Sequence, residues 1–468
     1  MSAREPGRLS RRRAIAGLGG AAVVGGAAAW PWGRGRDGGP RLPAAGGPLL
    51  WTANVSYAQD EFFGPAVAGH LLLVERPYAA RESERRDVLS CLDTATGRRL
   101  WSVRLDGSPG TLRRVLVSGA VALVRTRSAL HAFDLRTGRL LWRRERNAGG
   151  PRSLTVTVGG GLVHDSANEE NASSIASRHA LQGYEVGSGR LRWTTVVQPR
   201  VSTAEAPIYA AGLLLGTAVM AGVSSNSETF AYAVDAATGR QRWSRRLGVR
   251  HSFTGVGVAH DAGTFYVFSQ ETGDLHAVDV STGAIRWRAR AKRSSGRGTP
   301  SVDERTLRAG VPVVSGATVY VCDEYGVLHA FDVRNGRERW TFTTDARPRY
   351  AHLLPGPRTG GDDLVYFRAG HTGRSSGGTL YALSARQRRP LWQRPADHSY
   401  SGPLLSGNLL YVPDAEAITV YDPVGGAVRH RVELRGLGLG GGSTELVSDG
   451  TRVHALARIQ VLALRLES

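Results

Sequence analysis

A chain of 468 residues, of which 41% are hydrophobic, holds ample material for a packed core, and its 60 glycines suit a fold with many tight turns. The formal net charge is +20, yet lysine occurs only at position 292 and arginine is spread through every segment. Nucleic-acid-binding chains gather basic residues on one face or segment, so this distribution argues against nucleic acid as a partner. Two explanations stay open: a GC-rich genome that encodes arginine in place of lysine, or a basic surface that meets acidic partners or anionic lipid.

The first residues have the pattern of an export signal. Arg11–Arg13 form a basic segment, an apolar run rich in alanine and glycine covers 14–29, and Ala27–Ala29 offer small residues for cleavage. The paired arginines resemble a twin-arginine (Tat) signal, and a general secretory signal is the alternative. We therefore predict that residues 1–29 are a Tat-like export signal and that the protein is extracytoplasmic or secreted.

The segment after this signal is predicted to be a linker. Residues 30–46 contain Pro31, Pro40, Pro43 and several glycines, a composition typical of a flexible connection. The apolar run before it is short and glycine-rich, whereas a membrane span needs about 20 apolar residues. Membrane contact is therefore expected only through an uncleaved signal.

From residue 47 onward one pattern recurs: a short apolar strand, an acid, a turn that ends in glycine, and a tryptophan eight residues after the acid. The intact copies pair Asp93 with Trp101, Asp134 with Trp142, Asp235 with Trp243, Asp279 with Trp287 and Asp332 with Trp340, and Glu185 with Trp193 is a variant. Two copies are degenerate, because Ser384 precedes Trp392 without the glycine and Asp422 is followed by His430 in place of tryptophan. Successive copies of the acid position, with Ser384 counted in its degenerate copy, lie 38 to 53 residues apart, the period of a four-stranded propeller blade.

Each part of the repeat has a mechanical reason. An acid at a strand end accepts hydrogen bonds from the N–H groups of the turn, and glycine adopts the positive φ that a tight hairpin needs. A large indole in the next strand fills the gap between neighbouring blades. We predict this docking role for Trp101, Trp142, Trp193, Trp243, Trp287, Trp340 and Trp392.

The two ends of the repeat region complement each other. Residues 47–51, ending in Trp51, look like a tryptophan strand without its partners, and 459–464 look like the strand that precedes one. Their pairing would close a ring and remove both sheet edges. The predicted fold is thus all-β, a single propeller of four-stranded antiparallel blades over 47–466. Nine tryptophan-type strands are countable, but eight blades are favoured because most propellers have about four to eight.

The cysteines and the recurring histidines are predicted to be structural. Cys91 and Cys322 belong to no CxxC pair, and each lies in a predicted strand, so two buried, unpaired thiols are expected. His131, His276 and His329 recur at one blade position shortly before the acid, and repetition at one position indicates packing rather than catalysis.

The segment from His131 to Trp142, HAFDLRTGRLLW, resembles the PQQ-like (pyrroloquinoline-quinone-type) repeat, and the resemblance extends over roughly 47–466. It implies a propeller but two classes of function. Quinoprotein alcohol and glucose dehydrogenases bind pyrroloquinoline quinone and calcium on the axis, and many carry adjacent cysteines, which this chain lacks. A second, non-catalytic group includes the lipoprotein scaffold of the outer-membrane β-barrel assembly machine and extracytoplasmic modules of actinobacterial proteins. The chain resembles the second group more, and its composition is typical of actinobacteria, which argues against the outer-membrane role itself.

Inserted residues fall on one side of the predicted blades. Stretches at 75–87, 165–179, 221–228 and 368–378 separate the second strand of a unit from the third, and 292–312 precedes an innermost strand. In a propeller these connections share one face, and binding residues concentrate on loops held by a rigid scaffold. The candidates on this face are Arg76, Asn226, Arg297, His371 and Arg374.

One of these stretches carries oxygen ligands. Asn168, Glu169, Glu170 and Asn171 could help to hold calcium, but a solvated acidic loop is the favoured reading, so no metal site is predicted.

The sequence therefore favours an exported scaffold without a catalytic residue or cofactor, which binds a protein or polymer outside the cytoplasm. The alternative is a quinoprotein oxidoreductase with a divergent site for pyrroloquinoline quinone and calcium.

Overall fold

The computed structural model describes residues 48–466 apart from gaps in the connections between strands. The gaps are 57–64, 76–86, 106–114, 127–128, 146–155, 170–176, 205–206, 221–227, 251–255, 270–271, 292–310, 324–325, 345–347, 372–376, 397–401, 438–443 and 458. The described residues belong to one compact unit, 40–468. The export signal predicted at 1–29 and the linker at 30–46 lie outside them. Within the described part, no helix is long and apolar enough to cross a membrane.

The described residues form nine blades, which we number in chain order. Blade 1 contains β2 (Ala66–Val67), β3 (His70–Glu75), β4 (Val88–Asp93) and β5 (Arg99–Arg104). Blade 2 contains β6 (Val115–Ser118), β7 (Val121–Arg125), β8 (Ala129–Asp134) and β9 (Leu140–Glu145). Blade 3 contains β10 (Val156–Gly159), β11 (Leu162–Glu169), β12 (Ser177–Glu185) and β13 (Leu191–Ala204).

The next three blades follow the same order. Blade 4 contains β14 (Ile208–Ala210), β15 (Leu213–Met220), β16 (Glu228–Asp235) and β17 (Gln241–Arg250), and β15 also pairs with the end of β13, which joins blades 3 and 4 in one sheet. Blade 5 contains β18 (Val256–His260), β19 (Thr264–Ser269), β20 (Asp274–Asp279) and β21 (Ile285–Arg290). Blade 6 contains β22 (Val313–Ser315), β23 (Thr318–Cys322), β24 (Val327–Asp332) and β25 (Glu338–Thr343).

Two regular blades follow, and the ninth blade is built from both ends of the repeat region. Blade 7 contains β26 (Pro348–Thr359), β27 (Asp362–His371), β28 (Gly378–Ser384) and β29 (Arg389–Pro395), and blade 8 contains β30 (Leu404–Ser406), β31 (Leu409–Pro413), β32 (Ala417–Tyr421) and β33 (Val428–Glu433). A short 3-10 turn, η3 (Arg435–Leu437), follows. Blade 9 contains β34 (Glu445–Ser448), β35 (Arg452–Ala457), β36 (Gln460–Arg465) and β1 (Leu49–Asn54), in which Trp51 pairs with Ala463.

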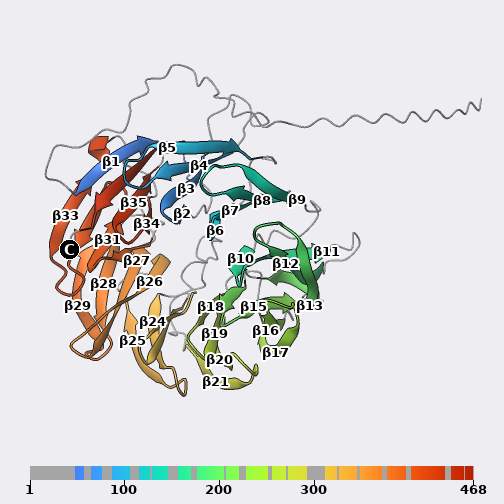
Figure 1. Ribbon diagram of the computed structural model, residues 1–468. Coiled ribbons are helices and arrows are strands. Elements are labelled where there is room, and N and C mark those ends of the chain that lie inside the picture. The colour runs from blue at the N-terminus through green and yellow to red at the C-terminus, as the bar shows by residue number, and fades with distance from the viewer. Residues whose placement is uncertain are drawn as a thin grey trace, which may run out of the picture. The chain divides into compact units, whose positions relative to one another are not determined.

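The prediction of an all-β propeller with antiparallel blades is confirmed, and the favoured number of eight blades is wrong. The first strands of most successive blades contact one another around the axis, as β2 with β6 and β22 with β26, and β34 of blade 9 contacts β2 of blade 1 (Figure 1). Each tryptophan-type strand is the fourth strand of its own blade, so the nine such strands in the sequence correspond to nine blades. The direct count of repeats was correct, and the preference drawn from other propellers was not.

The turn between the third and fourth strands closes in the same way in blade after blade. In blade 1 the carboxylate of Asp93 accepts hydrogen bonds from the N–H groups of Ala95 and Thr96, at 3.0 and 2.8 Å, and from the Thr96 hydroxyl at 2.8 Å. Gly97 then adopts φ +71°, a conformation that costs glycine little. In blade 4, hydrogen bonds from Arg242 and Thr238 lower the pKa of Asp235 to about 2, so this turn acid is a carboxylate at neutral pH.

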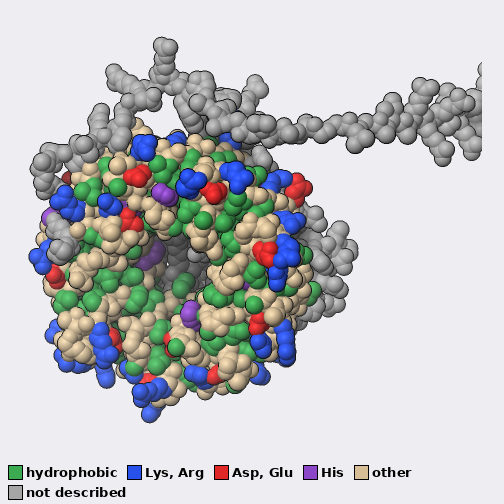
Figure 2. All heavy atoms as spheres, in the orientation of Figure 1, with side chains coloured by type: hydrophobic (Ala, Val, Ile, Leu, Met, Phe, Trp, Pro, Cys, Tyr) green, Lys and Arg blue, Asp and Glu red, His purple; other side chains and the backbone are tan. Residues whose placement is uncertain are grey.

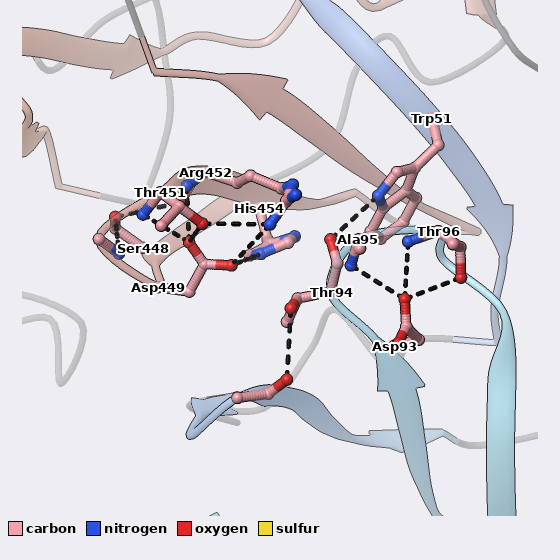
Figure 3. Close-up of polar contacts among 12 residues, drawn as sticks. Trp51, Asp93, Thr94, Ala95, Thr96, Ser448, Asp449, Thr451, Arg452 and His454 are labelled. Carbon is pink, nitrogen blue, oxygen red and sulfur yellow. Dashed lines mark hydrogen bonds and ion pairs between the residues drawn. The ribbon is translucent and has the colours of Figure 1, made fainter. Parts of the chain in front are cut away.

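Seven of the tryptophans in fourth strands pack on the turn glycine of the following blade. Their indole N–H groups donate to the carbonyl of the residue after the turn acid, as in Trp142 to Val186 at 2.8 Å and Trp243 to Val280 at 2.9 Å, whereas Trp340 in blade 6 makes no such bond within the described residues. Trp51 of β1 makes the same contact with Thr94 of blade 1 at 3.1 Å (Figure 3). The buried ring thus has its one polar group satisfied while its apolar surface fills the gap between blades.

The turn glycine is required by this ring as well as by its backbone conformation. A Cβ atom at Gly239 would lie 2.5 Å from Cδ2 of Trp193, whereas one at Gly212, in the same blade and also at positive φ, would meet nothing within 4 Å. Replacing either glycine by alanine costs about 1–2 kcal/mol for the left-handed backbone. Only Gly239→Ala also displaces a packed ring, at about 1–3 kcal/mol more.

We therefore expect Gly239→Ala to lower the thermal denaturation midpoint clearly more than its control, Gly212→Ala. Equal losses in the two variants would show that the ring of Trp193 does not constrain the turn.

Candidate functional site

The two ends of the blades differ in the length of their connections. At one end, which we call the turn face, the first and second strands are joined by two or three residues, such as 68–69, and the third and fourth by four to six, such as 236–240. At the other end, the loop face, the second strand joins the third and the fourth joins the next blade, and the connections reach the length of 291–312. The strand order therefore places every loop singled out from the sequence on the loop face.

Most of the predicted binding residues lie outside the described residues. This applies to Arg76, Asn226, Arg297 and Arg374, whereas His371 is the last residue of β27. Two of the predicted loop stretches overlap strands by several residues, because β11 continues to Glu169 and β27 to His371. Those boundaries were placed too early because polar residues continue the ladder beyond the apolar part of each strand.

The calcium candidates divide in the same way. Asn168 and Glu169 end β11, where their backbones pair with His179 and Arg178, and Glu170 and Asn171 lie outside the described residues. Among the residues that the structure describes, no three His, Cys, Asp or Glu side chains lie together as a metal-binding group.

Sequence reasoning missed a set of buried charges near the loop face. The clearest is Arg125, the last residue of β7, which forms an ion pair at 3.2 Å with Asp165 in β11. Both side chains are almost fully buried, at 2% and 3% exposure. The pair joins blade 2 to blade 3, and removal of one partner would leave a buried, uncompensated charge.

Two more buried charges tie other blades together. Glu75 at the end of β3 accepts a hydrogen bond at 2.9 Å from the backbone N–H of Ser56, which follows β1, so blade 9 is joined to blade 1. Arg368 in β27 is fully buried and donates to the carbonyl of Pro413 at 2.8 Å, which joins blade 7 to blade 8. A charged residue inside an otherwise apolar strand is the one sequence signal that could have identified these positions.

The remaining reactive groups are placed for packing. Cys91 and Cys322 are free and buried, as predicted, and burial raises the pKa of the Cys91 thiol to about 12, so it is a poor nucleophile. His131, His276 and His329 are buried. Burial alone lowers the pKa of His329, but hydrogen bonds to Asp323 and Glu338 outweigh that effect and raise it.

The geometry of the loop face is therefore that of a rigid platform. Strand ends are fixed by a buried ion pair and by hydrogen bonds between blades, and the connections of variable length start from these fixed points.

Comparison with known proteins assigns the chain to a family. The family described as outer membrane protein assembly factor BamB matches residues 41–229, 227–368 and 301–466. The chain belongs to this family. It is 25% identical over 234 residues to the BamB protein of Burkholderia pseudomallei, a match that covers 48% of this chain and 54% of that protein.

Two further similarities extend beyond assembly factors. The chain is 31% identical over 178 residues to the serine/threonine-protein kinase AfsK of Streptomyces griseus, which covers 37% of this chain and 20% of the kinase. The chain thus spans about a fifth of the kinase and about half of the Burkholderia relative. A europium-containing methanol dehydrogenase aligns with a TM-score of 0.52 over 87% of this chain and 84% of its own, and at 12% identity this likeness shows the fold alone.

The buried ion pair of the loop face yields a prediction. Arg125→Leu leaves Asp165 as an unpaired buried carboxylate, which should cost about 3–5 kcal/mol of unfolding free energy. The double variant Arg125→Leu/Asp165→Leu should recover most of that loss, because no charge remains to be desolvated. Urea denaturation of both variants measures the difference.

An exposed pair in the same blade is the control. Arg143 and Glu145 lie 2.6 Å apart with 31% and 78% of their side chains exposed, and Arg143→Leu should cost less than about 1 kcal/mol. A double variant no more stable than Arg125→Leu would refute the pairing.

Proposed function

We propose that this chain is an exported, non-catalytic β-propeller that binds a protein or polymer partner through its loop face. The observation that carries the proposal is the contrast between the two faces. The turn face repeats one short hydrogen-bonded turn from blade to blade, while the connections of the loop face differ in length from blade to blade. Variation in length on a fixed scaffold is typical of a surface that is adapted to a particular partner.

The buried charges support the same reading. An ion pair and a hydrogen bond between blades, made by Arg125 and Arg368, keep strands in place without offering a nucleophile or a general base to a substrate. Fixed strand ends reduce the conformational freedom that the loops lose when a partner binds, which favours affinity.

The relatives support a protein as the partner. The similar protein of Burkholderia pseudomallei is named an outer membrane protein assembly factor, and assembly of other proteins requires contact with them. Export of this chain is proposed from the basic segment Arg11–Arg13 and the apolar run 14–29.

The test is recovery of a partner by cross-linking and affinity purification from the native envelope. Shortening 170–176 or 293–310 removes loop residues while leaving every described strand intact. We expect the partner to be lost from at least one of these variants. The control, Ala95→Gln with Ala237→Gln, changes two exposed residues of the turn face and should retain the partner. Unchanged recovery with both shortened loops would contradict the assignment to this face.

The proposal also includes the absence of a bound quinone. A ligand present at a hundredfold excess over its Kd stabilises the folded state by about 2.7 kcal/mol. We expect pyrroloquinoline quinone with calcium to leave the melting temperature of the purified protein unchanged. A rise of several degrees at saturating cofactor would instead favour a quinoprotein oxidoreductase.

A further inference from the structure

The turn face carries arginine at one recurrent position. The fifth residue after the turn acid, or after Ser384 in blade 7, is arginine in six blades and alanine in two. These turn arginines are Arg98, Arg139, Arg190, Arg240, Arg337 and Arg389, and the alanines are Ala284 and Ala427. All six arginines are exposed.

The repeated turn holds their backbones at equivalent places. The backbone N–H groups of Arg98, Arg139 and Arg240 each donate at 3.3 Å to the hydroxyl of the threonine two residues earlier. In blade 6 the side chain of Asn335 replaces the hydroxyl and accepts from the N–H of Arg337 at 2.9 Å. The guanidinium groups therefore start from matching points on blades around the ring.

Most of these guanidinium groups form no ion pair with the acid of their turn. In blade 4 the carboxylate of Asp235 already pairs with Arg242 at 2.6 Å and bonds its own turn, so Arg240 has no acid left to meet. Only Arg190 pairs with its turn acid, Glu185, at 2.6 Å. Within the part of the chain that the structure describes, no hydrogen bond or ion pair holds the other five guanidinium groups: Arg98, Arg139, Arg240, Arg337 and Arg389.

The other turns of the turn face, which join first and second strands, carry few charges. The turns between first and second strands are mostly built from glycine and alanine, as at 68–69, 160–161 and 211–212. Asp261 and Asp449, the acids of the longer inner turns, are engaged by backbone N–H groups of their own turns. Figure 2 shows arginine side chains gathered around the outer edge of the visible face rather than around its centre.

We propose that the turn face docks on the surface of an anionic phospholipid bilayer through these turn arginines. Five unpaired guanidinium groups distributed over blades 1, 2, 4, 6 and 7 fit a partner that is flat, extended and negatively charged, because a small ligand could not contact arginines on all five blades at once. Arginine binds phosphate oxygens with two parallel N–H donors. The inference is independent of the proposed function, which concerns the loop face.

The test is sedimentation of the full chain with vesicles of phosphatidylglycerol or of phosphatidylcholine. The variant replaces Arg98, Arg139, Arg240, Arg337 and Arg389 by alanine, the residue that blades 5 and 8 already carry at this position. Each basic residue near an anionic membrane contributes about fivefold to binding, so we expect the variant to bind phosphatidylglycerol vesicles about a hundredfold or more weakly. Wild-type binding should also fall as salt is added.

The matched control removes the same charge elsewhere. Arg104, Arg143, Arg246, Arg290 and Arg431 are exposed on fourth strands after the tryptophan position, and their replacement by alanine lowers the net charge equally. This control should bind nearly as well as wild type. Equal weakening of the two variants, or wild-type binding to phosphatidylcholine as strong as to phosphatidylglycerol, would overturn the proposal.

A second measurement reports orientation. An environment-sensitive fluorophore on Ala284→Cys, at the turn face, should shift to the blue when phosphatidylglycerol vesicles are added. The same fluorophore on Val196→Cys, an exposed position of β13 beyond the turn, should not. The native cysteines are buried and leave the labels specific. A shift at Val196 alone, or no shift at either site, would also count against docking through the turn face.

Discussion

The structure depends on one repeated contact, an indole ring laid on the turn glycine of the next blade. A Cβ atom on that glycine would lie 2.4–2.7 Å from the nearest ring atom in the intact copies, so the ring and the turn fit only without a side chain. The same turn supplies the carbonyl that accepts the indole N–H, for example at 2.9 Å between Trp287 and Val333. Acid, glycine and tryptophan are thus parts of one interface between blades. The constant spacing of eight residues places each tryptophan in the strand that directly follows its own turn.

The two degenerate copies mark the places where this contact changes. In blade 7, Arg388 takes the left-handed conformation at φ +58° that glycine has in the other turns. In blade 8, His430 replaces the tryptophan that would pack on blade 9. The third and fourth strands of blade 9 come from opposite ends of the repeat region, and the N–H of Arg465 meets the carbonyl of Pro48 at 2.7 Å where a continuous turn would stand.

The same logic explains what the sequence could and could not predict. Local chemistry predicted the turns, the buried cysteines and the all-β fold, because each depends on residues close together in the chain. The number of tryptophan-type strands counted in the sequence, nine, also equals the number of blades. The ion pair between Arg125 and Asp165 could not be predicted in this way. Each residue alone is expected at the surface, and the contact between them depends on how two blades pack. Polar residues at the end of β11 hid its true length for a similar reason.

A uniform turn also leaves some positions free. The acid, the glycine and the tryptophan are fixed by hydrogen bonds and by packing, whereas the fifth residue contributes its backbone to the turn, and only in blade 3 does its side chain pair with the turn acid. Drift at an unconstrained surface position would be expected to scatter residue types around the ring. The position instead holds arginine six times and alanine twice. A GC-rich genome explains why the cation is arginine rather than lysine, but a basic residue at one structural position in six blades requires a further cause, and a shared contact of the turn face supplies one.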